Sequence, residues 1–179
     1  MSHSNSDVVE QYVAFCAGPL RDATQSRAEY EILVNHPDVT FVGFHNPSVL
    51  MVGTPPIIIE HRHNEYLVGE FIIFLVRHRV GRVWEVDFRF FNVTNPLNSE
   101  CGLPHYYQHP HVLADSHPLI EGVAGRMCIQ RGQQAVYQHI RQGKMHLAAP
   151  RLVTILRIYG TGNPYQGVEF WPKLIGGKK

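Results

Sequence analysis

The sequence predicts a single α+β domain in which helices near both ends of the chain flank an antiparallel sheet. Apolar residues recur at helical spacing near both ends, whereas residues 39–91 show the shorter period of strands. The chain has 179 residues, of which 44% are hydrophobic, and this is enough for one core. We therefore expect N-terminal helices, an antiparallel β-meander, an irregular loop and C-terminal helices, in that order.

Two helices are predicted before the sheet. The first covers residues 7–16, with Asp7 as a candidate N-cap. The second begins at a capping-box pattern formed by Ser26 and Glu29, in which each side chain bonds to the other residue's backbone N–H. We expect this helix to end near Asn35.

Five strands are expected to follow, separated by Gly, Pro and Asn residues. They cover residues 39–44, 49–52, 57–61, 67–77 and 82–91. In the last of them apolar and charged residues alternate, so we expect one buried face and one wet face. The buried face would carry Trp84, Val86, Phe88 and Phe90, and the wet face Glu85, Asp87 and Arg89.

The region 92–127 is expected to be an irregular loop, because it is rich in Pro, Gly, Asn and His. A connection of this length in a compact domain is often functional. Two helices are expected after it, over residues 133–142 and 150–159. In the second, Pro150 suits the first helical turn and Gly160 suits the C-terminal cap.

The composition gives no sign of a nucleic-acid or membrane partner. The formal net charge is +1, so the one-sign field that sequence-independent binding to phosphates needs is missing. The longest apolar runs, such as residues 71–76, have the length of a strand rather than the roughly 20 residues of a membrane helix. Residues 1–10 lack the layout of a signal peptide. We expect a cytoplasmic protein whose three cysteines are reduced.

A histidine-rich segment of the loop raises the possibility of a zinc site. Cys101, His105, His109 and His111 lie within eleven residues, and they are the ligand types that zinc prefers. Their spacing, C-x3-H-x3-H-x-H, matches none of the common structural zinc patterns. Zinc binding is therefore an alternative interpretation of this segment.

Cys128 offers a second interpretation of the same region. It follows Gly125-Arg126-Met127, so a glycine permits a close approach of the backbone just before the thiol. Arg126 would favour the thiolate if its side chain pointed toward the sulfur. Taken alone, Cys128 fits either of two roles, a small buried side chain or a nucleophile.

Taken in order, these parts resemble the ubiquitin-conjugating enzymes, whose His-Pro-Asn triplet precedes a catalytic cysteine in a Gly-x-[Ile/Val]-Cys-[Leu/Ile] context. Here the corresponding residues are His109-Pro110-His111 and Gly125-Arg126-Met127-Cys128-Ile129. The segments 148–156 and 162–165 look like a later helix of the family and the Pro-Asn-Pro that follows it. The likeness spans residues 24–170. It implies an N-terminal helical extension (1–22), a catalytic domain (23–172) and a flexible tail (173–179).

Some features depart from the family pattern. The triplet ends in His111 rather than Asn, and the segment between the triplet and Cys128 is longer than usual. The family's Tyr-Pro-x-x-Pro-Pro signature is missing, with Asn95-Pro96-Leu97 as its nearest remnant. These departures resemble divergent bacterial or phage-type members, some of which belong to antiviral conjugation systems.

The resemblance implies a transferase that carries a ubiquitin-like modifier as a thioester on Cys128 and passes it to an amine on a target protein. It implies an activating enzyme as a further partner, and no cofactor. His111 would act as an oxyanion donor, a base or a loop organiser, and His109 would be structural. Asp115 and His117 are weaker candidates for deprotonating the amine. The alternative within the same fold is a non-catalytic binding module of the RWD type.

Overall fold

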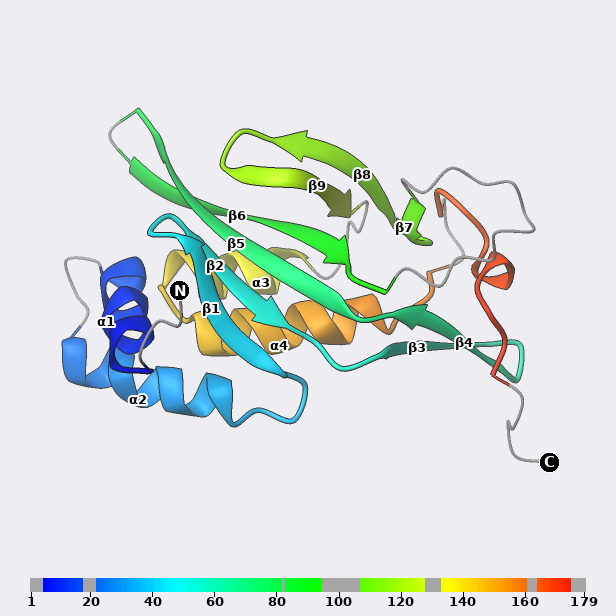
Figure 1. Ribbon diagram of the computed structural model, residues 1–179, viewed down its shortest axis with the longest axis horizontal. Coiled ribbons are helices and arrows are strands. Elements are labelled where there is room, and N and C mark those ends of the chain that lie inside the picture. The colour runs from blue at the N-terminus through cyan, green and yellow to red at the C-terminus, as the bar shows by residue number, and fades with distance from the viewer. Residues whose placement is uncertain are drawn as a thin grey trace.

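The computed structural model describes residues 5–17, 22–81, 83–94, 107–127, 133–160 and 164–174, and it confirms the α+β class (Figure 1). The helices are α1 (Asn5–Cys16), α2 (Ala23–Val34), α3 (Gln133–Arg141), α4 (Met145–Leu156) and the 3-10 turn η2 (Val168–Phe170). The strands are β1 (Phe41–Asn46), β2 (Val49–Gly53), β3 (Ile57–His61), β4 (Asn64–Gly69), β5 (Phe71–Val80), β6 (Val83–Asn92), β7 (Tyr107–His109), β8 (Val112–His117) and β9 (Ile120–Met127).

Seven of these strands form one antiparallel sheet, in the order β1-β2-β5-β6-β9-β8-β7, and β3 pairs with β4 in a separate hairpin. Both faces of the central strands are covered. Alternate residues of β5 enter either the main core with the helices or a second cluster with Ile120 and Ala124 of β9. The β8–β9 hairpin therefore covers the sheet face opposite the helices (Figure 1). This explains why residues 71–76 are apolar at every position.

Helix α2 begins earlier than the capping-box pattern predicts. Its N-cap is Asp22, whose carboxylate accepts a hydrogen bond from the backbone N–H of Thr24 at 3.1 Å. Ser26 and Glu29 lie inside the helix and are buried, so the predicted capping box is wrong. The helix ends at the expected place, with Asn35 as its C-cap.

Helix α1 packs on the main core rather than standing away from it. Its Tyr12 contacts Tyr30 of α2 edge to face, with ring centroids 5.4 Å apart, and its Phe15 contacts Phe44 of β1. The helix begins at Asn5, so Asp7 lies in the first turn and is not the N-cap that we predicted.

Arg77 of β5 holds the C-terminal end of α1. Its guanidinium donates hydrogen bonds to the carbonyl groups of Ala14, Phe15 and Ala17, at 2.8, 3.0 and 3.2 Å. It also lies over the ring of Trp84, 4.7 Å from the centroid. Because α1 has no basic residue in its last turn, Arg77 supplies the positive charge that favours a helix C-terminus.

Replacing Arg77 with methionine is expected to destabilise the fold by about 1–2 kcal/mol, through the loss of charge-assisted bonds to the end of α1. Arg79→Met, at an exposed position of the same strand, is the matched control and should change stability by less than about 0.5 kcal/mol. Urea unfolding of both variants checks the prediction. Equal stabilities of the two variants would contradict it.

The strand predicted over residues 67–77 is two strands. The break falls at Gly69, whose φ of 126° lies in a region that other residues rarely adopt. A side chain at this position would also overlap that of Asn92. The chain therefore turns between β4 and β5, and Asn92 donates a hydrogen bond to the Val68 carbonyl at 2.7 Å across the turn.

The irregular loop predicted over residues 92–127 is wrong for its second half. Residues 107–127 form β7, β8 and β9, whereas 95–106 lie outside the described residues. The β8–β9 hairpin also changes the expected wet face of β6. Arg89 is only 5% exposed, because the hairpin covers this part of the face that we predicted to be open to water, whereas Glu85 is exposed as predicted. On the face predicted to be buried, Trp84 is 56% exposed, so its predicted burial is wrong.

The two C-terminal helices are present, but the second begins earlier than expected. Helix α4 starts at Met145, so Pro150 lies inside it and not in its first turn. The helix ends at Leu156, with Arg157 as its C-cap, so Gly160 is not the cap residue. Helix α3 matches the prediction to within one residue.

The C-terminal segment returns to the β3–β4 hairpin. Lys173 bridges to Tyr66, and the backbone N–H of Leu174 donates to the Glu65 carbonyl at 2.8 Å. Thus the first two residues of the predicted tail are hydrogen-bonded to the body, and the rest lies outside the described residues. Within the described ranges, no helix combines the length and apolar composition that crossing a bilayer requires.

Candidate active site

The His-Pro-His triplet forms the turn between β7 and β8, and both of its imidazole rings are buried. His109 is fully buried and His111 is 4% exposed. Burying a polar ring is costly unless its nitrogen atoms are hydrogen-bonded. The contacts of the two rings therefore define how the turn is held.

His109 is bonded to backbone through both ring nitrogens. Its Nε2 lies 2.7 Å from the Leu156 carbonyl at the end of α4, and its Nδ1 accepts from the backbone N–H of His111 at 3.0 Å. Together these bonds require a neutral ring with its proton on Nε2. Burial lowers the pKa of His109 to about 3, against the opposing effect of the Leu156 carbonyl.

Pro110 ties the same turn to the C-terminal segment. Its carbonyl accepts hydrogen bonds from the backbone N–H groups of Tyr165 and Gln166, at 2.7 and 3.4 Å. The turn is thus fixed at the end of α4 by His109 and at the segment after it by Pro110. These contacts fix the backbone of the turn that contains His111.

His111 lies against the chain that leaves α4. Its ring centroid is 5.9 Å from that of Tyr159, at an interplanar angle of 48°. Burial lowers the pKa of His111, and a backbone hydrogen bond with Gly160 acts in the opposite direction. A bond that favours the protonated ring is one that the ring donates, so the acceptor is the Gly160 carbonyl. At neutral pH the ring is therefore uncharged and has a single N–H to donate.

The strand that leads to Cys128 pairs with the strand that leaves the turn. In this pairing Met127 lies opposite Val112, the residue after His111. At Gly125 a Cβ atom would lie 2.9 Å from the Leu113 carbonyl oxygen, so only glycine permits this approach of the two strands. Cys128 is joined directly to Met127, and it lies outside the described residues.

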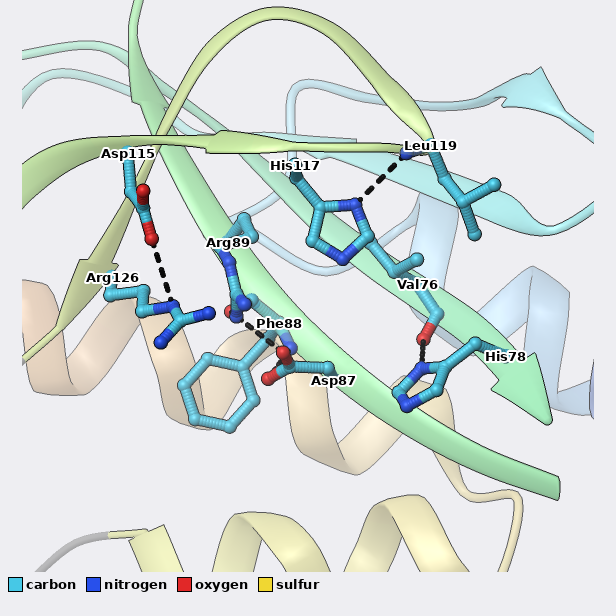
Figure 2. A network of polar contacts seen from close by, with 9 residues as sticks. All are labelled: Val76, His78, Asp87, Phe88, Arg89, Asp115, His117, Leu119 and Arg126. Carbon is cyan, nitrogen blue, oxygen red and sulfur yellow. Dashed lines mark hydrogen bonds and ion pairs between the residues drawn. The ribbon is translucent and has the colours of Figure 1, made fainter. Parts of the chain in front are cut away.

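The hairpin places the two weaker candidates away from the turn. Because a strand advances by roughly 3.3 Å per residue, Asp115 and His117 lie roughly 10 and 16 Å along β8 from Val112. Asp115 pairs with Arg126 at 3.1 Å, and His117 Nδ1 accepts from the Leu119 N–H at 3.2 Å (Figure 2). The pKa of His117 is lowered, first by burial and then by Arg89. The structure does not bring either side chain to His111.

A polar cleft of about 300 Å³ lies beside the end of β9. Its lining consists of Asp87, Phe88, Arg89, Arg126, Met127 and Tyr137. Arg126 reaches its rim, with its side chain 65% exposed and paired to Asp115. Burial and Asp87 raise the pKa of Tyr137. The charged alternation in β6 was visible in the sequence, but its position at a cleft depends on the fold of the hairpin.

The zinc alternative finds no support in the described residues. In that part of the chain, no three His, Cys, Asp or Glu side chains are grouped to hold a metal ion. Both ring nitrogens of His109 already bond to backbone, so using this ring as a ligand would break one of those bonds. Cys101 and His105, the other proposed ligands beside His111, lie outside the described residues.

Comparison with known proteins does not assign this chain to a family. The chain matches no family model, no curated protein and no solved structure.

The contacts of His109 predict a specific dependence of stability on pH. Its pKa is about 6.5 in the unfolded chain and about 3 in the folded one, so between these values the unfolded chain binds the extra proton. The contribution is complete above pH 6.5 and is lost as the pH falls toward 3. His109→Gln is expected to be less stable at pH 7, and this deficit should shrink by about 2–3 kcal/mol by pH 4.5.

Urea unfolding of both chains between pH 7 and pH 4.5 measures that deficit. Carboxylates titrate in both chains, so their effect cancels in the difference. A deficit that does not change with pH would show that the fold does not hold His109 neutral.

Proposed function

We propose that the protein is a ubiquitin-conjugating-enzyme-like transferase. In this proposal it carries a ubiquitin-like modifier as a thioester on Cys128 and passes it to an amine on a target protein. The observation that carries the proposal is the pairing of β8 with β9, in which Met127 lies opposite Val112. Val112 directly follows the triplet and Met127 directly precedes Cys128, so the described residues next to each part of the sequence likeness pair with one another across two strands.

The rigid support of the turn favours the same proposal. A transfer site must hold its groups in place before reaction, because reorganisation during reaction raises the barrier. His109 and Pro110 fix the turn through backbone bonds at two separate segments. The described elements also supply the coarser features that the proposal expects, which are helices before and after an antiparallel sheet.

The reaction has two acyl-transfer steps. In the first, the Cys128 thiolate attacks the modifier's C-terminal carbonyl, held as a thioester on an activating enzyme that consumes ATP. A new C–S bond forms and the activating enzyme's thiolate leaves. In the second, a target amine attacks the carbonyl, the C–N bond forms, the Cys128 thiolate leaves, and the amine loses a proton to solvent. A thiolate is a good leaving group, so the acyl group stays reactive.

Both steps pass through an oxyanion, which a positioned donor stabilises. His111 is the candidate that the sequence likeness names for this position. Its ring packs against Tyr159, in the chain that follows α4, and the Gly160 backbone there acts on its pKa, so we assign His111 the organiser role rather than direct donation. In this role His111 ties the turn to the chain that follows α4.

A charging assay tests the proposal. The purified chain is mixed with its candidate activating enzyme, the modifier and ATP, and run on a gel with and without reductant. A reductant-sensitive adduct supports the thioester carrier. If an activating enzyme that demonstrably charges itself gives no adduct, the catalytic proposal fails and the non-catalytic binding module takes its place. A genomic neighbourhood with these partners would add support for a cytoplasmic, bacterial antiviral system.

A further inference from the structure

We propose that Tyr159, supported by His61, is a positioning residue that holds the ring of His111 in the active-site turn. The structural part of this inference stands alone, and its catalytic consequence rests on the proposed function. Three segments that are distant in the sequence meet here: the end of β3, the turn before β8 and the chain after α4.

Tyr159 contacts two imidazole rings. Its ring centroid lies 4.7 Å from that of His61, edge to face at 75°, and 5.9 Å from that of His111, tilted by 48°. Edge-to-face and tilted contacts of this kind are favourable arrangements of aromatic rings. The Tyr159 ring thus forms a packing surface for the ring of His111.

His61 is itself in contact with a further residue, Glu169. It is the last residue of β3, its side chain is 15% exposed, and its Nε2 lies 3.6 Å from Oε1 of Glu169 in η2. Glu169 faces solvent with about half of its side chain, whereas Tyr159 is partly buried. Glu169 is therefore the exposed end of this series and His111 the buried end, with the partly buried His61 and Tyr159 between them.

The packing of Tyr159 explains the state of His111. Burial is the largest cause that lowers the pKa of His111, and the ring of Tyr159 is part of what covers it. Among the described residues, the ring of His109 also lies near that of His111, with centroids 6.0 Å apart, and it is held neutral. Removing the Tyr159 ring would admit water to His111 and free its orientation toward the Gly160 carbonyl.

The test is an NMR titration of chains labelled at histidine, with the His111 signals assigned by their loss in His111→Gln. In Tyr159→Leu the pKa of His111 is expected to rise toward its usual range. Tyr159→Phe keeps the ring and should leave the pKa unchanged. His61→Asn should raise it by a smaller amount, while the matched control His63→Asn, at an exposed neighbouring position, should not. The signals of His109 report whether each variant is folded.

The rate of thioester discharge gives a second readout. It should fall about tenfold in Tyr159→Leu and recover in Tyr159→Phe. A pKa of His111 that is the same in Tyr159→Leu, Tyr159→Phe and the parent chain would overturn the positioning role. A raised pKa in Tyr159→Leu supports that role even if the parent chain forms no thioester, and in that case only the proposed function fails.

Discussion

Replacing Cys128 with alanine is expected to abolish the reductant-sensitive adduct completely. The thioester requires a sulfur atom at the position that follows β9, and alanine offers no nucleophile there. Cys128→Ser is also expected to give no reductant-sensitive adduct, because a modifier carried on a hydroxyl would be an ester. The measurement is the band intensity on non-reducing and reducing gels after charging.

The chain offers a matched control for this result. Cys101→Ser makes the same exchange at another cysteine of the loop region, and its adduct is expected to equal that of the parent chain. If the adduct persisted in Cys128→Ala and vanished in Cys101→Ser, the carrier would be Cys101 and the assignment of Cys128 would be wrong.

The second large effect is expected at His111. His111→Ala should lower the rate of discharge to an amine by about 100-fold. The turn then loses the ring that packs on Tyr159, in the chain after α4, and the groups around the oxyanion are no longer held in place. His111→Asn should recover most of this rate, since its amide can donate to the Gly160 backbone. Single-turnover discharge of the preformed thioester to free lysine measures both variants.

The pH dependence separates the possible roles of His111. Its pKa is lowered below the usual 6.5, so the ring is neutral and its charge is constant between pH 7 and pH 9. An organiser or donor role predicts that the ratio of the parent rate to the His111→Ala rate stays constant over this range. A ratio that changes strongly with pH there, or equal rates for the two chains, would contradict the account.

The sequence predicted the α+β class and most element types because those depend on local spacing of apolar residues. Helix starts were less predictable, because several residues compete for the N-cap. The N-cap of α2 is Asp22 and not Ser26, and Pro150 lies inside a helix that starts at Met145. In each case the packing of the whole helix on the core outweighed a local signal.

The β8–β9 hairpin escaped prediction because its residues include Pro, Gly, Asp and His, which are not typical of strands. The contacts that depend on this hairpin and on other distant segments could not be predicted from the sequence either. The burial of Arg89 depends on the hairpin covering the sheet, and the contact of His111 with Tyr159 joins segments that the sequence holds forty-eight residues apart. The buried backbone contacts of His109 also depend on where α4 ends, and no local pattern fixes that position.

The most direct test of the central claim is intact-mass analysis of the charged chain, followed by fragmentation to locate the attached modifier. The account predicts a mass equal to chain plus modifier less one water, loss of the modifier on treatment with a thiol, and attachment at Cys128. Attachment at a lysine, or an adduct that survives the thiol, would contradict a thioester carrier.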